Sequence, residues 1–429
     1  MDINVIFTLV PRLLPTFMLG IVALLGLLFQ RKSTSEVISG TIKTMAGVII
    51  LFTAVDLLVG TISPLSEMFG TVYTYGGGAE LKPVADFTIF LGQYGLQVVL
   101  VMVFGFLVNV LLARFTPLKY VFLSGHILFW NAFMVTAALA DSGVLKGTAL
   151  VIIGSIVLGI LSTVLPALLA PSVRKLTGSN DFTIGHTTTS LAIVGVWVAK
   201  LFGDESKSTE DMEIPESLSF FKEMVISTSL IMVLLYLIIG IIAGPQGVAD
   251  TYAGGQVWIW FIWTIFKGIS FGAGLVILLT GVRMMLAEII PAFHGIAAKV
   301  VPNAVPALDC PMVFPYAPNA LAIGFPIAMV TSLITLIIFG SFGYSYVLLP
   351  LVVAAFFDAG PAAILGNAVG GRRGAILAAA VGGVLLIVLQ ALSLPFIANS
   401  AGSFIQAFGG NDFSLIAIVV GGIAKLLGL

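Results

Sequence analysis

The sequence predicts an all-α, polytopic membrane protein, and three observations support this fold class. First, 59% of its 429 residues are hydrophobic, only 9% are charged, and the mean hydropathy is +1.15, whereas soluble domains carry roughly 25% charged residues. Second, apolar runs of about 20 residues, the length that a helix needs to cross the hydrocarbon core, recur along the chain. Third, the 47 glycines permit close helix packing and interrupted helices.

The apolar runs define the expected elements in chain order and predict roughly ten to twelve crossings. The first run is too long to be a removable signal peptide and carries Pro11 and Pro15, so we interpret it as the first span. The runs lie near residues 8–30, 38–60, 88–113, 120–140, 145–170, 222–244, 256–281, 326–340, 374–398 and 413–428.

One long hydrophilic stretch divides the chain. Residues 203–220 (GDESKSTEDMEIPESLSF) are acidic, and the stretch is too short to fold independently. We therefore predict a linker between a first membrane half, 1–202, and a second, 221–429. Lys and Arg in short loops mark the cytoplasmic side, and the clearest pairs are Arg31 with Lys32, Arg114 with Lys119, and Arg174 with Lys175.

The two halves show a faint internal likeness. GTIKTMAGVIILF at 40–52 resembles GVRMMLAEIIPAF at 281–293, and YVFLSGHILFWNA at 120–132 resembles YVLLPLVVAAFFD at 346–358. Repeated spans are typical of transporters whose halves surround a site at the membrane midplane. Chance similarity between apolar helices is the alternative.

Ionisable side chains inside the membrane indicate where a site could lie, because each costs roughly 2.5–3.5 kcal/mol at mid-helix. Arg283 and Glu288 are five residues apart, and we favour a structural role for them. His294 precedes Gly295, where a helix end provides a cap or solvent contact. The remaining candidates are His126, His186 and Asp309.

The two histidines share a sequence context. His126 in LSGHILFWN and His186 in TIGHTTTS each follow a glycine and precede further polar residues, which indicates interrupted helices. Backbone N–H groups at a restarted helix attract an anion or an electron-rich oxygen. The hydroxyls of Thr187, Thr188 and Thr189 add hydrogen-bonding groups, unless they bond to their own backbone carbonyls.

Asp309 lies in a segment that cannot be one continuous helix. Residues 302–326 contain six prolines, and non-helical backbone at membrane depth survives only when it is buried in protein or lines a wet cavity. A carboxylate in such a place can accept two hydroxyl hydrogen bonds from a polyol. A structural capping role is the alternative.

These stretches resemble the membrane component, enzyme IIC, of the ascorbate-specific phosphotransferase system. The similar stretches are RKS…GTIKT at 31–44, LSGHILF at 123–129, FTIGH at 182–186, GVRMMLAEIIPAFHGI at 281–296, LDC with YAPNA at 308–320, and GG-R at 370–373. They are spread over most of the chain in the order and spacing of the family.

The resemblance implies a multi-pass homodimer in the bacterial inner membrane. Each protomer is expected to have about eleven spans, two structural repeats, and a scaffold and a core domain, with an elevator-like movement of the core. Members of the family import L-ascorbate, and a separate cytosolic IIB protein phosphorylates it during entry. This IIB protein carries a phosphocysteine and receives its phosphoryl group from a IIA component. Cys310 lies in an apolar, proline-rich segment, so we interpret it as a packing residue rather than a phosphocarrier.

The resemblance also assigns residues. The family's substrate histidine and the next position correspond to His186 and Thr187, its substrate aspartate corresponds to Asp309, and LSGHILF adds His126. The chain departs from the family where Thr187, Thr188 and Thr189 replace glutamines. The resemblance therefore implies L-ascorbate, or a related small sugar acid or polyol, as the expected substrate.

Other function classes fit less well. A channel would need rings of like groups or a repeated filter, and a hydrolase would need a nucleophile with a base, or paired histidine ligands. We predict no metal, no cofactor and no catalytic residue of the chain's own, and the net charge of −1 argues against nucleic acid. The remaining alternative is an ion-coupled secondary transporter of a small organic acid or polyol, without phosphorylation.

Overall fold

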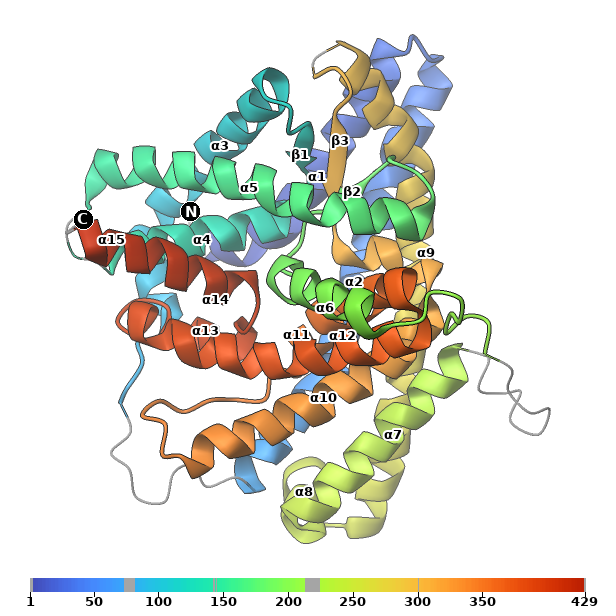
Figure 1. Ribbon diagram of the computed structural model, residues 1–429, viewed down its shortest axis with the longest axis vertical. Coiled ribbons are helices and arrows are strands. Elements are labelled where there is room, and N and C mark those ends of the chain that lie inside the picture. Colours follow the sequence, from blue (N-terminus) through green and yellow to red (C-terminus); the bar gives the residue numbers. More distant parts are fainter. Residues whose placement is uncertain are drawn as a thin grey trace.

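The computed structural model describes residues 3–72, 82–141, 143, 145–212, 224–299 and 301–427. Helices dominate this part of the chain (Figure 1). Up to residue 202 the elements are α1 (Ile3–Phe29), α2 (Thr34–Val72), α3 (Phe87–Phe115), β1 (Tyr120–Phe122), α4 (Gly125–Ala140), α5 (Gly147–Thr177), β2 (Thr183–Ile184) and α6 (Thr189–Phe202).

The second half has the same mixture of long and interrupted helices. Its elements are α7 (Met224–Ala243), α8 (Pro245–Tyr252), α9 (Val257–Lys299), β3 (Val305–Leu308), the 3₁₀ helix η2 (Cys310–Tyr316), α10 (Pro318–Ser341), α11 (Val352–Ala354), the π-helical turn η3 (Ala355–Ala359), α12 (Gly360–Ile397), α13 (Gly402–Phe408), α14 (Asp412–Ile416), η4 (Ala417–Gly421) and α15 (Gly422–Leu427).

Several helices are suited to crossing a membrane. Six helices of the described part are long and apolar enough to do so, and a seventh span results if the pair α7 and α8, bent by 112°, is counted as one. This confirms a multi-pass, mostly helical membrane protein but not the higher expected count. With 16 and 14 residues, α4 and α6 are shorter than the roughly 20 residues of a full span.

The helices pack in groups. Helices α1, α2, α7 and α9 pack on one another, α6 and α10 both pack on α12, and α3 packs on α4 and α5. In Figure 1 the long α9 runs along the vertical axis at the right, whereas α5 and α12 run across it. Two differently oriented groups of helices therefore meet in one molecule.

Glycines allow α2 and α9 to approach closely. A Cβ atom added at Gly47 would lie 2.9 Å from the backbone nitrogen of Met285, and one at Gly281 would lie 2.7 Å from that of Leu51. Small residues at such contacts are typical of helix packing in membranes. The two segments of the first proposed repeat thus lie against each other, while the repeat itself stays a prediction.

A small parallel sheet accompanies the helices in the described part of the chain, and the sequence did not predict it. Its strand order is β1–β3–β2, with Val121 opposite Pro306 and Thr183 opposite Ala307. Strands of two to four residues are too short to show the alternation by which strands are recognised. Because β3 comes from the second half and both neighbours come from the first, the sheet joins the halves.

Helix α12 is interrupted near its first third. Gly371 has φ 59° and ψ −153°, a combination that is open to glycine and costly for other residues. A Cβ atom there would also lie 2.1 Å from the carbonyl oxygen of Asp204. Glycine is therefore required by both its backbone conformation and its neighbour.

The described part of the predicted linker, residues 203–212, docks on this interruption, and we call it the strap. The N–H of Asp204 donates to Gly370 O (2.8 Å), and the N–H of Arg372 donates to Lys207 O (2.7 Å). The carboxylate of Glu210 accepts from the N–H of Ala320 (3.1 Å) at the start of α10. Residues 203–212 are thus bonded to α10 and α12, while residues 213–220 lie outside the described residues.

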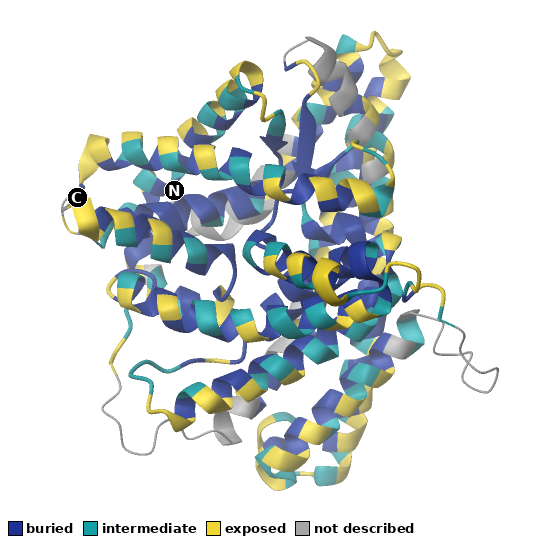
Figure 2. Cartoon of the chain, viewed as in Figure 1, coloured by how far each residue is buried: buried dark blue, intermediate teal, exposed yellow. Residues whose placement is uncertain are grey.

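Apolar side chains cover much of the outer surface. Figure 2 shows exposed residues along the outward-facing turns of the helices, and the large apolar ones include Ile42, Leu96, Phe104, Trp258 and Phe266. Soluble monomers rarely expose contiguous apolar areas of this kind. In a bilayer these faces contact lipid.

Candidate functional site

The three short strands lead directly to the candidate site residues. Strand β1 is followed by Ser124, Gly125 and His126, β2 by Gly185 and His186, and β3 by Asp309. Parallel strands end at the same edge of a sheet, and ligands commonly bind beyond their carboxyl ends. The sheet therefore brings His126, His186 and Asp309 together.

A glycine permits this approach at β2. A Cβ atom added at Gly185 would lie 2.8 Å from the carbonyl oxygen of Ala307, while the N–H of Gly185 donates to Leu308 O (2.6 Å). The glycine before His186 thus allows close contact with β3. The sequence indicated that this glycine interrupts a helix, and the structure shows this close contact as a second role.

Asp309 lies between the two imidazole rings. Its Oδ2 is 3.3 Å from His126 Nε2, and its Oδ1 is 3.6 Å from His186 Nε2. The N–H of Cys310 donates to Oδ1 (2.7 Å), which helps to orient the carboxylate at the start of η2. The result is a His–Asp–His row whose members come from three separate segments.

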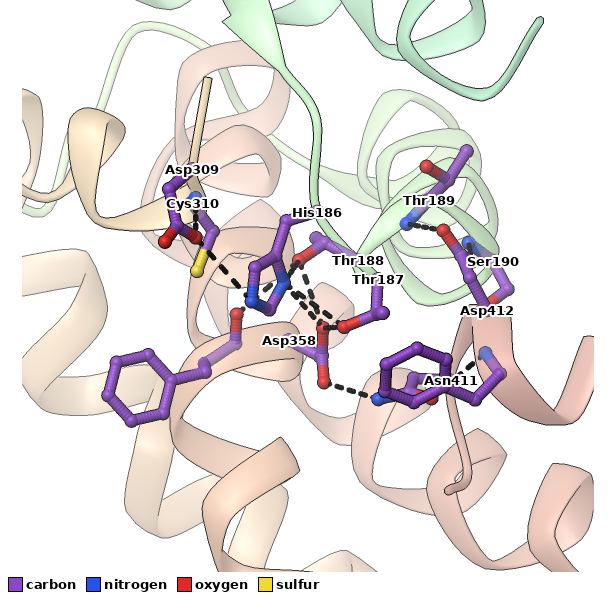
Figure 3. Close-up of polar contacts among 12 residues, drawn as sticks. His186, Thr187, Thr188, Thr189, Ser190, Asp309, Cys310, Asp358, Asn411 and Asp412 are labelled. Carbon is purple, nitrogen blue, oxygen red and sulfur yellow. Dashed lines mark hydrogen bonds and ion pairs between the residues drawn. The ribbon is translucent and has the colours of Figure 1, made fainter. Parts of the chain in front are cut away.

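A second carboxylate, Asp358, lies on the far side of His186. Figure 3 shows it among His186, Thr187, Thr188 and Asn411. Its Oδ1 is 3.0 Å from His186 Nδ1 and accepts from the hydroxyls of Thr187 (2.6 Å) and Thr188 (3.2 Å). Its Oδ2 accepts from Asn411 Nδ2 (2.7 Å). Both carboxylate oxygens are thus hydrogen-bonded.

The N-terminus of α6 is occupied by a third carboxylate. Asp412 accepts from the backbone N–H groups of Thr189 (3.0 Å) and Ser190 (2.6 Å), and its own N–H donates to Thr187 O (3.0 Å). An anion at a helix N-terminus is stabilised by these N–H groups and by the helix dipole. The sequence predicted that these N–H groups bind a ligand, but in the structure they donate to the side chain of Asp412.

A cavity of about 250 Å³ opens at this group of residues. The volume far exceeds the roughly 10–15 Å³ that one water needs, so a small organic solute can enter. Its polar lining consists of His126, His186, Thr187, Asp309, Asp358 and Asn411, and its apolar lining of Ile127, Trp130, Pro311, Val353, Ala354, Phe357, Phe404, Phe408 and Phe413. None of these lining residues is Lys or Arg.

The aromatic wall has a defined arrangement. The rings of Trp130 and Phe404 lie 4.9 Å apart with an interplanar angle of 30°, and Phe404 also contacts Phe408 and Phe413. An apolar pocket with a few converging polar groups is typical of small-molecule sites. The cavity is suited to a ligand with one polar edge and one apolar face.

The described residues include one group that could hold a metal. The possible ligand atoms of His126, His186 and Asp309 lie within 4.8 Å of one another. Each imidazole faces a carboxylate oxygen at 3.3 or 3.6 Å, distances that are typical of ion pairs between these groups. We interpret the row as hydrogen-bonding groups for a polar ligand.

The sequence-predicted residues occupy distinct places. His126, His186, Thr187 and Asp309 line the cavity, whereas Thr188 is completely buried and its hydroxyl donates to Asp358. Glu288 pairs with Lys43 (3.3 Å), Cys310 is completely buried, and the side chain of His294 lies outside the described residues. Asp358, Asn411 and Asp412 were not singled out from the sequence.

Asp358 satisfies the criterion that identified Asp309. It is a lone carboxylate in the apolar run VVAAFFDAGPAA, and a buried ionisable group in a membrane helix is costly unless it has a partner or a function. Asn411 and Asp412 follow two glycines, and no local pattern distinguishes them from an ordinary helix cap.

Two comparisons with known proteins show which family the chain resembles. A sequence model of the family described as "PTS system sugar-specific permease component" (EIIC-GAT) matches residues 12–412. The "Ascorbate-specific PTS system EIIC component" of Mycoplasma pneumoniae (strain ATCC 29342 / M129 / Subtype 1) is 27% identical in an alignment 441 positions long, which covers 90% of this chain and 66% of that protein. The chain thus spans slightly less than two thirds of the length of that relative.

Proposed function

Because the chain belongs to the EIIC-GAT family of sugar-specific permease components of the phosphotransferase system, we propose that it imports L-ascorbate across the bacterial inner membrane. The substrate is phosphorylated during entry by a cytosolic IIB protein, which receives its phosphoryl group from IIA. The similarity to the ascorbate-specific component of Mycoplasma pneumoniae supports ascorbate. A similar small sugar acid is the alternative substrate that Thr187, Thr188 and Thr189 leave open.

The observation that carries this proposal is the His126–Asp309–His186 row in the lining of a small cavity with an aromatic wall. Asp309 can accept hydrogen bonds from two hydroxyls, and bonds to an ionised acceptor are the stronger ones. The imidazoles can contact the enediol oxygens, and Trp130 offers an apolar surface to the flat lactone ring. Ascorbate, with an acidic enediol at one end and a diol at the other, presents both kinds of group.

Transport requires the site to be reached from each side in turn. We assign α1, α2, α7 and α9, which pack on one another, to a scaffold that forms a homodimer, and the helices around the sheet to a core that moves against it. The sheet supports this division because it ties β1, β2 and β3 into one hydrogen-bonded unit. The three site segments can then travel together.

The phosphoryl group must come from another protein. The single cysteine, Cys310, is completely buried, and phosphoryl transfer needs a nucleophile that its donor can reach. The IIB protein is expected to dock on the cytoplasmic side, which the basic residues Arg174 and Lys175 mark. The chain then contributes substrate binding and passage, and IIB contributes the chemistry.

The test is transport by purified protein in liposomes. With external ascorbate and with IIA, IIB and a phosphoryl donor inside, we expect ascorbate phosphate to accumulate inside, and to disappear when IIB is omitted. Accumulation of unmodified ascorbate driven by a proton or sodium gradient would instead establish the ion-coupled secondary transporter. Conduction of ions without substrate would contradict both.

A further inference from the structure

Asp358 lies at a distortion of the helix that carries it. It belongs to the π-helical turn η3, between α11 and α12, and follows the buried Phe356 and Phe357. π-helical turns inside α-helices are rare and occur frequently at functional sites. The turn directs a single carboxylate, only 2% exposed, to the cavity wall.

The carboxylate has more polar neighbours than a structural cap requires. Oδ1 is shared by His186 Nδ1 (3.0 Å) and the two hydroxyls of Thr187 and Thr188 (2.6 and 3.2 Å), and Asn411 binds Oδ2 (2.7 Å). Three of these partners belong to the GHTTTS segment and one to the chain before α14. Asp358 thus joins two separate segments at the cavity.

The two nitrogens of the His186 ring face different carboxylates. Nδ1 faces Asp358 at 3.0 Å, and Nε2 faces Asp309 at 3.6 Å beside the cavity. An ionised carboxylate only accepts hydrogen bonds, and the partner of one ring nitrogen decides what the other can do. An ionised Asp358 can therefore hold a proton on Nδ1, while the ring edge with Nε2 faces Asp309 beside the cavity.

We propose that Asp358 is a positioning residue of the substrate site, which holds a proton on His186 Nδ1 and thereby fixes the orientation of the ring and of the Thr187 hydroxyl. It acts through His186 and Thr187, because its own oxygens are occupied by protein donors. This role rests on the proposed function only for the identity of the ligand. The state of the ring is a property of the protein alone.

The ring state can be measured directly because the chain has three histidines. Full-length protein labelled with ¹⁵N-histidine gives three pairs of imidazole signals, one from Nδ1 and one from Nε2 of each ring. A His126→Gln variant and a His294→Gln variant identify the pairs that do not belong to His186. In the wild type we expect His186 to carry a proton on Nδ1. In Asp358→Asn we expect the His186 signals to shift, while those of His126 and His294 change little.

Two results of the same experiment overturn the proposal. One is a His186 ring whose Nδ1 is unprotonated in the wild type, and the other is a His186 signal unchanged by Asp358→Asn. Should that variant fail to fold, as size-exclusion chromatography would show, the wild-type spectrum decides alone. None of these outcomes requires ascorbate.

The consequence for binding is measured by calorimetry with ascorbate. We expect Asp358→Asn to weaken binding roughly 10- to 100-fold, the size of effect seen when groups that orient a metal-binding histidine are removed in other proteins. The matched control is Glu205→Gln, which removes a carboxylate that is 62% exposed in the strap, and it is expected to bind as the wild type. If Asp358→Asn binds ascorbate as tightly as the wild type, the proposal is wrong. If the wild-type protein itself does not bind ascorbate, the proposed function is wrong, but the measured protonation of His186 still tests the role of Asp358.

Discussion

His126 and Asp309 belong to opposite halves of the chain, yet His126 Nε2 lies 3.3 Å from Asp309 Oδ2. The contact depends on the sheet, since His126 follows β1 and Asp309 follows β3. The row continues to His186 at 3.6 Å. One carboxylate thus has an imidazole on each side, so its removal should affect both rings.

Replacing Asp309 or His186 by Ala is expected to abolish ascorbate uptake while the protein stays folded. Each change leaves a buried partner without its hydrogen bond, at about 1–3 kcal/mol, and removes a group that faces the ligand. Uptake of labelled ascorbate by cells that also produce IIA and IIB measures the loss, and size-exclusion chromatography checks the fold. Normal transport by both variants would place the site elsewhere.

A substitution at Thr187 can separate the contribution of its hydroxyl from the contribution of its size. Thr187→Val keeps the shape but loses the bond to Asp358 (2.6 Å), and a hydrogen bond to a charged group contributes about 1.5–3 kcal/mol. We therefore expect ascorbate binding to weaken roughly 10-fold or more. Calorimetry on the purified variant measures it, and an unchanged affinity would show that the hydroxyl is dispensable.

Thr187→Gln tests the substrate. Glutamine donates and accepts as threonine does, and its longer side chain can extend into the cavity of about 250 Å³. We expect this variant to keep ascorbate binding in a thermal-shift screen against ascorbate, hexitols and pentoses, because a ligand stabilises the state that it binds. If the wild-type protein binds another polyol and not ascorbate, the assignment of ascorbate as the substrate is wrong.

Gly371→Ala is expected to destabilise the protein. The substitution places a Cβ atom 2.1 Å from Asp204 O at φ 59°, and a non-glycine residue in such a conformation costs about 1–3 kcal/mol. The matched control is Gly92→Ala in α3, where a Cβ atom meets nothing within 4 Å. Thermal unfolding in detergent should show a lower midpoint for Gly371→Ala only, and equal midpoints would contradict the role of the kink.

Glu210→Ala should loosen the start of α10. The carboxylate accepts from the N–H groups of Asn319 (3.4 Å) and Ala320 (3.1 Å), and loss of such a cap costs about 0.5–2 kcal/mol. We expect faster hydrogen exchange at the first turn of α10, with Glu205→Gln as the control. Exchange that is unchanged in Glu210→Ala would mean that the strap does not stabilise this helix end.

The membrane fold and most of the polar row could be predicted from local patterns. Glycine before His126 and His186, and the prolines around Asp309, are costly inside a continuous helix, so their presence indicated interrupted segments with a purpose. That these segments converge depends on pairing across about 120 residues for β2 and about 185 for β1, which local patterns do not contain. The sheet was therefore absent from the prediction.

Asp358 could have been noticed as a lone carboxylate in an apolar run, but its hydrogen-bond partners could not be predicted. Its side chain is hydrogen-bonded to residues about 170 positions away, and its π-helical turn has no sequence pattern that differs from an ordinary helix. The same applies to Asp412, whose partners Thr189 and Ser190 lie in α6. Such partners become visible only when tertiary contacts place them side by side.

The central position of β3 also has a consequence for biosynthesis. Strands β1 and β2 both pair with β3, so neither has its partner when it leaves the ribosome. About 120 residues separate β2 from β3, which at typical elongation rates is on the order of ten seconds. During that interval the first half must enter the membrane with these strands unpaired, and the cavity becomes complete only after the second half has been inserted.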